Sequence, residues 1–295
     1  MKHTKSMTAG WADVLNISLL GLLSLAMLFP FYYIFAVSFT SYQEYATSEL
    51  ILWPHRWVTD AYAYILDSRE FIRSIGVTIY VTVVGSIVNI LLTATMAYAI
   101  TRNIWGQKVM LVLVMFTFVF HAGMIPTYLM VKETGLLNSY WALIVPGAIN
   151  SFNLIVIRQF FLSIPEELKE AAVIDGANDL HIFSRIIVPL SKPAFAAFGL
   201  FYAVGHWNTY FSAILYLNNP AKWTVQVVLR QIVILDDAKE TLASAGRDAA
   251  RAAELPPSDT VGMAAILLAT LPILVVYPFL QRHFAKGVML GSIKG

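Results

Sequence analysis

The stretch SIGVTIYVTVVGSIVNILLTATMAYAIT, residues 74–101, contains no Asp, Glu, Lys or Arg. A helix that crosses about 30 Å of hydrocarbon needs roughly 20 mostly apolar residues, because each residue adds about 1.5 Å and every backbone group must bond within the segment. This stretch meets both conditions. It predicts a membrane-spanning helix, and with it an all-α membrane protein.

Five further runs meet the same test. They also lack acidic and basic side chains, and they lie at residues 14–37, 109–131, 139–157, 193–217 and 260–280. The first run is longer than the roughly 7 to 15 apolar residues of a secretion signal, and no small-residue cleavage site follows it. We therefore predict six transmembrane helices in a single transmembrane domain, residues 1–295, with no second domain.

Composition and charge support a chain that faces lipid. Hydrophobic residues make up 58% of the 295 residues and charged residues only 13%, whereas a soluble domain carries about 25% charged residues. Six spans place both termini on one side, and slightly more than half of the 20 Lys and Arg residues then share that side. By the positive-inside rule we expect a multi-pass inner-membrane protein with both termini cytoplasmic.

Several function classes are disfavoured. The net charge is only +2 and the basic residues are scattered, unlike the clustered basic face of a nucleic-acid-binding protein. Cysteine is absent and the six histidines have no ligand spacing, so we expect neither thiol chemistry nor a metal site. A Gly-x-x-x-x-Gly-Lys-Ser/Thr phosphate loop is also missing, so the chain is not expected to be catalytic or to hydrolyse ATP itself.

The internal loop between the fourth and fifth spans, residues 158–192, has a helical pattern. Ser163 is a plausible N-cap, which predicts a helix starting near Ile164 with acidic residues in its first turn. The pattern continues to Gly176, a residue suited to a helix end that needs positive φ. We predict a short amphipathic helix on the cytoplasmic surface.

This loop carries a spaced motif. It consists of Glu170-Ala171-Ala172, three residues that end in Asp175, then Gly176, nine residues, Ile186, one residue and Val188-Pro189. The motif resembles the EAA signature of binding-protein-dependent ABC importer permeases of the maltose and glycerol-phosphate type. The family pattern has Leu before the proline, where this chain has Val188.

The resemblance implies a type I ABC importer permease fold, with helices two to six as the transport core and helix one against a partner. The motif residues Glu170, Ala171, Ala172, Asp175, Gly176, Ile186 and Pro189 would form the coupling loop that docks on an ATPase. The implied partners are a second homologous permease subunit, an ABC ATPase dimer that holds ATP and Mg²⁺, and an extracytoplasmic solute-binding protein. No cofactor is expected on this chain itself.

Two other stretches extend the resemblance and suggest the cargo. Gly205-His206-Trp207-Asn208 and the C-terminal tail look most like permeases for oligosaccharide or polysaccharide uptake, such as alginate-oligosaccharide importers. In maltose-type relatives the tail reaches between the two ATPases. The matching residues Gly287, Gly291, Lys294 and Gly295 would do the same here, or else form an ordinary frayed terminus.

Polar and aromatic residues within the spans are candidates for a sugar path. They are Asn89, Asn150, Asn153, His206, Trp207, Asn208 and Tyr210. Polar groups at membrane depth face protein or water, but they also form ordinary hydrogen bonds between helices. Both interpretations of these residues remain open.

Other functions remain as alternatives. An ABC permease for a non-sugar solute fits the same motif. A secondary transporter would need a charged relay residue within the membrane, which the six spans lack. A membrane-embedded enzyme or a purely structural subunit would not need the coupling loop. An Ala-rich stretch, residues 241–255, is expected to form an external surface helix that contacts the binding protein or only covers the cavity.

Overall fold

A computed structural model describes residues 7–48, 50–243 and 258–287, and the regular elements in these ranges are all helical. Contacts divide the chain into two units. The first unit comprises Met1–Arg69 and Leu229–Ala269, and the second comprises Glu70–Val228 and Thr270–Gly295. Each unit is described by itself below.

The first unit is built on long apolar helices. It contains α1 (Met7–Ser38), α2 (Tyr42–Thr47), α3 (Asp60–Asp67), most of α14 (Val225–Ala243) and the start of α16 (Ser258–Gly287). Leu15 and Leu25 of α1 are 70% and 71% exposed. Such a helix requires an apolar environment around it, which lipid or another apolar helix provides.

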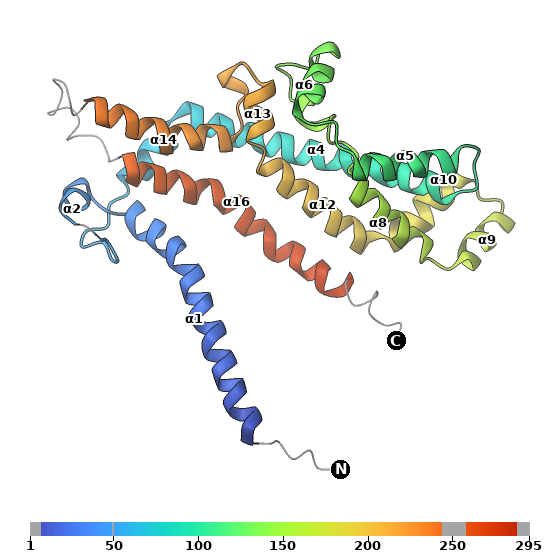
Figure 1. The fold of residues 1–295 in the computed structure, drawn as a ribbon, viewed down its shortest axis with the longest axis horizontal. Coiled ribbons are helices and arrows are strands. Elements are labelled where there is room, and N and C mark those ends of the chain that lie inside the picture. The colour runs from blue at the N-terminus through green and yellow to red at the C-terminus, as the bar shows by residue number, and fades with distance from the viewer. Residues whose placement is uncertain (1–6, 49, 244–257, 288–295) are drawn as a thin grey trace. The chain divides into compact units, whose positions relative to one another are not determined.

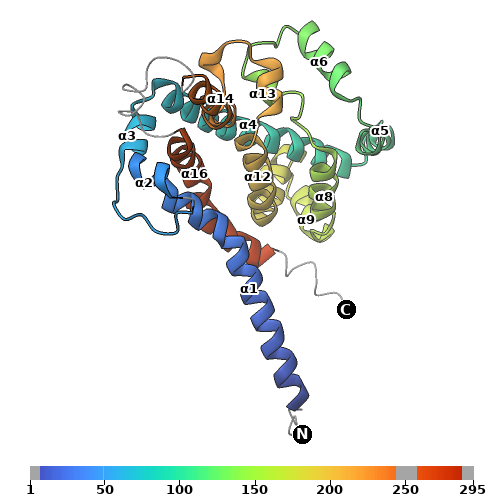
Figure 2. The same cartoon turned by 60° about the vertical axis from the view of Figure 1, so that its left-hand side comes forward.

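Aromatic contacts hold the segment that follows α1. Figure 2 shows α2 and α3 near the C-terminal end of α1. The Val58 amide donates to the Phe39 carbonyl (3.0 Å), and the hydroxyls of Ser38 and Tyr62 share a hydrogen bond of 2.7 Å. The rings of Phe39 and Tyr62 are 4.7 Å apart, and burial raises the pKa of the Tyr62 phenol. The loop after the first span is therefore packed onto the end of its helix.

The second unit holds most of the helices (Figure 1). They are α4 (Arg69–Thr101), α5 (Gln107–Val119), α6 (Met124–Glu133), α7 (Trp141–Ile144), α8 (Ser151–Leu162), α9 (Glu166–Ile174), α10 (Asp179–Ile182), the π-helix η1 (Phe183–Ile187), α11 (Val188–Leu190), α12 (Lys192–Trp207), α13 (Phe211–Tyr216) and the 3₁₀-helix η2 (Pro220–Lys222), together with the first residues of α14 and the end of α16.

Three of the predicted spans are continuous helices. Within the described residues, Gly10–Ser38, Arg69–Thr101 and Asp259–Val276 are long and apolar enough to cross a membrane. These segments contain the predicted ranges 14–37 and 74–101 and most of 260–280. An uncharged apolar run of this length therefore located the straight helices.

The other three predicted spans are each interrupted. The range 109–131 is divided between α5 and α6, 139–157 between α7 and α8, and 193–217 between α12 and α13. At the first break Gly123 has φ +84°, a conformation that glycine adopts without strain. At the second, the Asn150 side chain accepts a hydrogen bond from the Asn153 amide and so caps the start of α8.

The predicted loop 158–192 leads into α12 through a bend. Asp179–Leu190 and Lys192–Trp207 form a helix pair bent by 80°, and Ser191 at the bend is fully buried. Of the predicted surface helix 241–255, the first residues belong to the end of α14, and residues 244–257 lie outside the described part of the chain.

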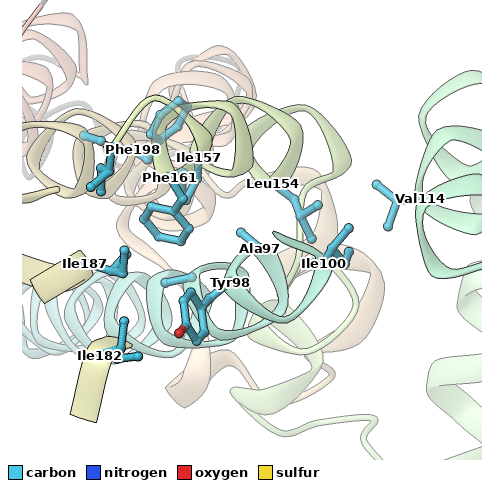
Figure 3. Packing of buried hydrophobic residues seen from close by; sticks show 13 residues of the cluster. Ala97, Tyr98, Ile100, Val114, Leu154, Ile157, Phe161, Ile182, Ile187 and Phe198 are labelled. Atoms are coloured by element: carbon cyan, nitrogen blue, oxygen red, sulfur yellow. The ribbon is translucent and has the colours of Figure 1, made fainter. Parts of the chain in front are cut away.

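A hydrophobic cluster joins α4 to the helices on both sides of the loop. Ala97 and Ile100 of α4 are fully buried, as are Leu154 and Ile157 of α8 and Ile187 of η1. Figure 3 shows Phe161 and Ile187 gathered around Tyr98. The coupling loop is thereby anchored at both ends to one long helix.

Truncation in this cluster should destabilise the second unit. Leu154→Ala removes a fully buried side chain and should cost roughly 2–5 kcal/mol. The check is thermal unfolding in detergent, followed by tryptophan fluorescence. Val112→Ala, at a side chain that is 67% exposed, is the control and should shift the midpoint little. Equal shifts in both variants would contradict the assigned core.

Candidate functional site

The predicted short helix in the loop is present as α9, but it begins later than expected. Ser163 is not its N-cap, so that prediction is wrong. Ser163 instead ends α8, where its hydroxyl donates to the Phe160 carbonyl (2.7 Å). Helix α9 begins at Glu166 after Pro165, and Glu166 and Glu167 occupy its first turn, where acidic side chains favour the helix dipole.

The end of α9 is a Schellman motif. The Ala177 amide donates to the Ala172 carbonyl (2.8 Å) and the Gly176 amide to the Val173 carbonyl (3.0 Å). Gly176 has φ +83°, which this motif requires and which a Cβ atom would strain. The glycine at this position is therefore needed to turn the chain from α9 towards α10.

The EAA-type residues divide into an exposed and a packed set. Glu170, Ala171, Asp175 and Gly176 are exposed, and so is Pro189 in α11. Ala172 and Ile186 pack against the cluster that includes Ile182 and Ile187. One set thus presents a surface while the other fixes that surface to the second unit.

Sequence reasoning missed two features of this surface. Ile174 and Leu180 are 85% and 74% exposed, although apolar side chains on a short polar loop are normally covered. Lys169 is buried, and its Nζ pairs with Glu166 Oε2 at 2.8 Å. A surface cavity of about 370 Å³ adjoins the turn, lined by Asp175, Gly176, His181, Arg185 and their neighbours. Exposed apolar side chains beside a polar hollow are typical of a protein docking surface.

A second candidate site lies among the predicted path residues. Asn89 of α4 donates through Nδ2 to His206 Nε2 of α12 (3.0 Å), and the hydroxyls of Thr93 and Tyr202 share a hydrogen bond of 2.8 Å. The Asn150 amide donates to the Tyr202 hydroxyl at 3.3 Å. Three separate helices therefore meet through polar side chains.

A cavity of about 540 Å³ borders this cluster. Its lining includes four of the seven predicted path residues, Asn89, Asn150, Asn153 and His206. Tyr202 and Thr209 also line it and were not predicted, although Tyr202 precedes His206 by one helical turn. None of the described residues that line the cavity is charged.

The other three predicted path residues do not join this lining. Trp207 borders a different, apolar groove of about 760 Å³ between α4, α12 and α16. Asn208 donates its side-chain amide to the Val204 carbonyl (3.0 Å), and Tyr210 packs against the cluster around Val77 and Tyr216. The structure thus places these three residues in packing or backbone contacts.

The remaining candidates are simply located. Gly287 is the last residue of α16, while Gly291, Lys294 and Gly295 lie outside the described residues. A search of the described His, Asp and Glu side chains finds no group of three or more that could hold a metal ion.

Comparison with known proteins follows this geometry closely. The family model of the "Binding-protein-dependent transport system inner membrane component" matches residues 6–290. Protein LplC of Bacillus subtilis (strain 168) is 49% identical over 284 residues, which cover 96% of this chain and 95% of LplC. The polygalacturonan/rhamnogalacturonan transport system permease protein YtcP of the same organism is 47% identical over 285 residues, covering 96% and 98%.

Solved structures show the same similarity. A chain of a bacterial ABC transporter involved in the import of the acidic polysaccharide alginate superposes with a TM-score of 0.88 at 33% identity, covering 96% of this chain and all of that chain. A chain from a bacterial alginate ABC transporter in complex with alginate pentasaccharide-bound periplasmic protein gives a TM-score of 0.55 at 17% identity, covering 95% and 96%, and supports the fold alone.

The close approach of α4 and α12 gives a test of the polar cluster. A Cβ atom at Gly85 would lie 2.5 Å from His206 Nε2. Gly85→Val should therefore displace His206 from Asn89 and cost roughly 1–3 kcal/mol, measured by thermal unfolding in detergent. Gly76→Val is the matched control, because a Cβ at Gly76 of the same helix meets no atom within 4 Å. Similar shifts for the two variants would refute this packing.

Proposed function

The chain belongs to the family of binding-protein-dependent transport system inner membrane components, and we propose that it is one of two transmembrane subunits of an ATP-driven importer for a sugar or oligosaccharide. A member of this transport family is a non-catalytic inner-membrane subunit. The observation that carries the proposal is α9, a short exposed helix ended by a Schellman turn at Gly176 and placed between membrane helices.

The exposed helix suits mechanical coupling for a physical reason. An ATPase at the cytoplasmic face can move membrane helices only through a rigid element that it grips. Ala171 permits close approach of a partner surface, Glu170 offers an exposed carboxylate for a basic partner group, and Ile174 adds apolar area. Closure of the ATPases would then be passed on as a rigid-body movement.

The lining of the 540 Å³ cavity supports a carbohydrate cargo. Asn89, Asn150 and Asn153 provide amides, and Tyr202 and Thr209 provide hydroxyls; these groups both donate and accept hydrogen bonds, as sugar hydroxyls do. YtcP is named for polygalacturonan and rhamnogalacturonan transport, and the superposing solved chain comes from an alginate importer. We propose that an oligosaccharide passes along this surface, and that alginate-type oligosaccharides are one candidate.

The proposal includes an assembly. A second homologous permease would complete the path and contact α1, and two ATPase subunits would hold ATP and Mg²⁺. An extracytoplasmic solute-binding protein would deliver the sugar. Both termini would be cytoplasmic, and the tail with Gly287, Gly291, Lys294 and Gly295 would reach the ATPases. The chain itself would bind no cofactor.

Reversing the charge at Glu170 tests this function. In the reconstituted complex, Glu170→Lys should lower sugar-stimulated ATP hydrolysis at least tenfold, because removing one partner of a desolvated ion pair costs about 2–5 kcal/mol. The assay uses the cognate binding protein with galacturonate or alginate oligosaccharides. Glu133→Lys, the same change at the exposed end of α6, should have little effect.

The two variants also separate the possible explanations. Loss of stimulation by Glu170→Lys in a complex that still assembles supports a coupling role for α9. Full stimulation in both variants would show that α9 is not the coupling element. Absence of ATP-dependent uptake by the native complex with every test sugar would exclude the proposed cargo class.

A further inference from the structure

One face of α4 makes polar contacts along most of its length with the segment that follows the coupling helix. Thr78 Oγ1 accepts from the Val225 amide (2.8 Å), Asn89 bonds His206, and Thr93 bonds Tyr202. The positions Asn89 and Thr93 are four residues apart, so they lie one above the other on the helix surface. The contacts therefore belong to a single stripe.

The stripe continues to the loop end of the helix. The rings of Tyr98 and Phe183 are 5.0 Å apart. Just beyond α4, the Arg102 guanidinium pairs with Asp179 Oδ1 at 2.7 Å. Asp179 is the first residue of α10, three residues after Gly176. Arg102 is thus the contact of this stripe nearest to the coupling helix.

Only two ion pairs occur among the described side chains. One, Lys169 with Glu166, lies within α9 itself. The other, Arg102 with Asp179, joins two different helices. Arg102 and Asp179 side chains are 30% and 61% exposed, so the pair contributes little to stability. Its position at the junction between the loop and α4 points to a mechanical role instead.

We propose that the Arg102–Asp179 pair is a positioning contact that fastens the coupling loop to α4, so that α4 carries loop movement to the polar cavity. The inference rests on the proposed function. Asn89 lies thirteen residues from Arg102, which corresponds to about 20 Å along a helix. A continuous helix fixed at the loop end by Arg102 and joined to His206 at Asn89 transmits a displacement over that distance without bending.

A cysteine reporter in the cavity measures this transmission directly. The chain contains no cysteine, so Gly147→Cys introduces a single thiol. Gly147 lines the 540 Å³ cavity, and a Cβ there meets no atom within 4 Å. The measurement is the rate at which sulfonatoethyl methanethiosulfonate modifies this thiol in the reconstituted complex, with and without ATP and Mg²⁺, followed by the mass of this chain.

The variants are made in the reporter background. Arg102→Glu should reduce the ATP-dependent change in modification rate at least fivefold while the complex still hydrolyses ATP. The charge swap Arg102→Glu with Asp179→Arg should restore most of the change. Asp179→Asn, which keeps the size of the side chain, should reduce it in the same direction and serves if Arg102→Glu prevents assembly. Lys108→Glu, an exposed residue nearby, is the matched charge control and should leave the change intact.

The outcomes distinguish this inference from the proposed function. An ATP effect in the native reporter that persists in Arg102→Glu and Asp179→Asn would overturn the positioning role alone. Failure of the charge swap to restore the effect, in an assembled complex, would also overturn it. Absence of any ATP effect in the native reporter would overturn the proposed function and this inference together.

Discussion

Hydrogen bonding of the backbone in a medium without water is the constraint on which this structure depends. Irregular backbone at membrane depth is tolerated where it is enclosed by protein or borders a cavity. The breaks obey this rule: Gly147 and Asn150, between α7 and α8, and Thr209, after α12, line the 540 Å³ cavity. Ala122, in the break before α6, lines another cavity of about 300 Å³. The interruptions of the helices and the polar hollows are therefore the same feature.

The sequence predicted the helical class, the straight helices and the short loop helix, because each depends on local patterns. An uncharged apolar run reports only that a segment prefers lipid. It does not report that Gly123 adopts a left-handed φ or that Asn150 caps a new helix, because polar caps within an apolar run look like isolated polar residues. Three spans were consequently predicted as single helices where the structure has two.

The candidate sites were predicted unevenly for the same reason. Spacing located Gly176, whose role depends on the residues beside it. The partners of Asn89 and the exposure of Ile174 depend on how helices pack, which no local pattern encodes. Trp207 shares a turn with His206 yet faces a different groove. Helical periodicity around Asn89 and His206 would have added Thr93 and Tyr202, each one turn away.

The π-helix η1 has a consequence for sequence change in this loop. A π-turn accommodates one residue more than an α-helical turn, and each residue of an α-helix accounts for about 100° of rotation. Phe183–Ile187 therefore sets the angular register between Asp179 before it and the buried Ile187 at its end. Deleting one residue here would rotate everything that follows by about that angle. Length in this segment is consequently under stricter constraint than the identity of its exposed side chains.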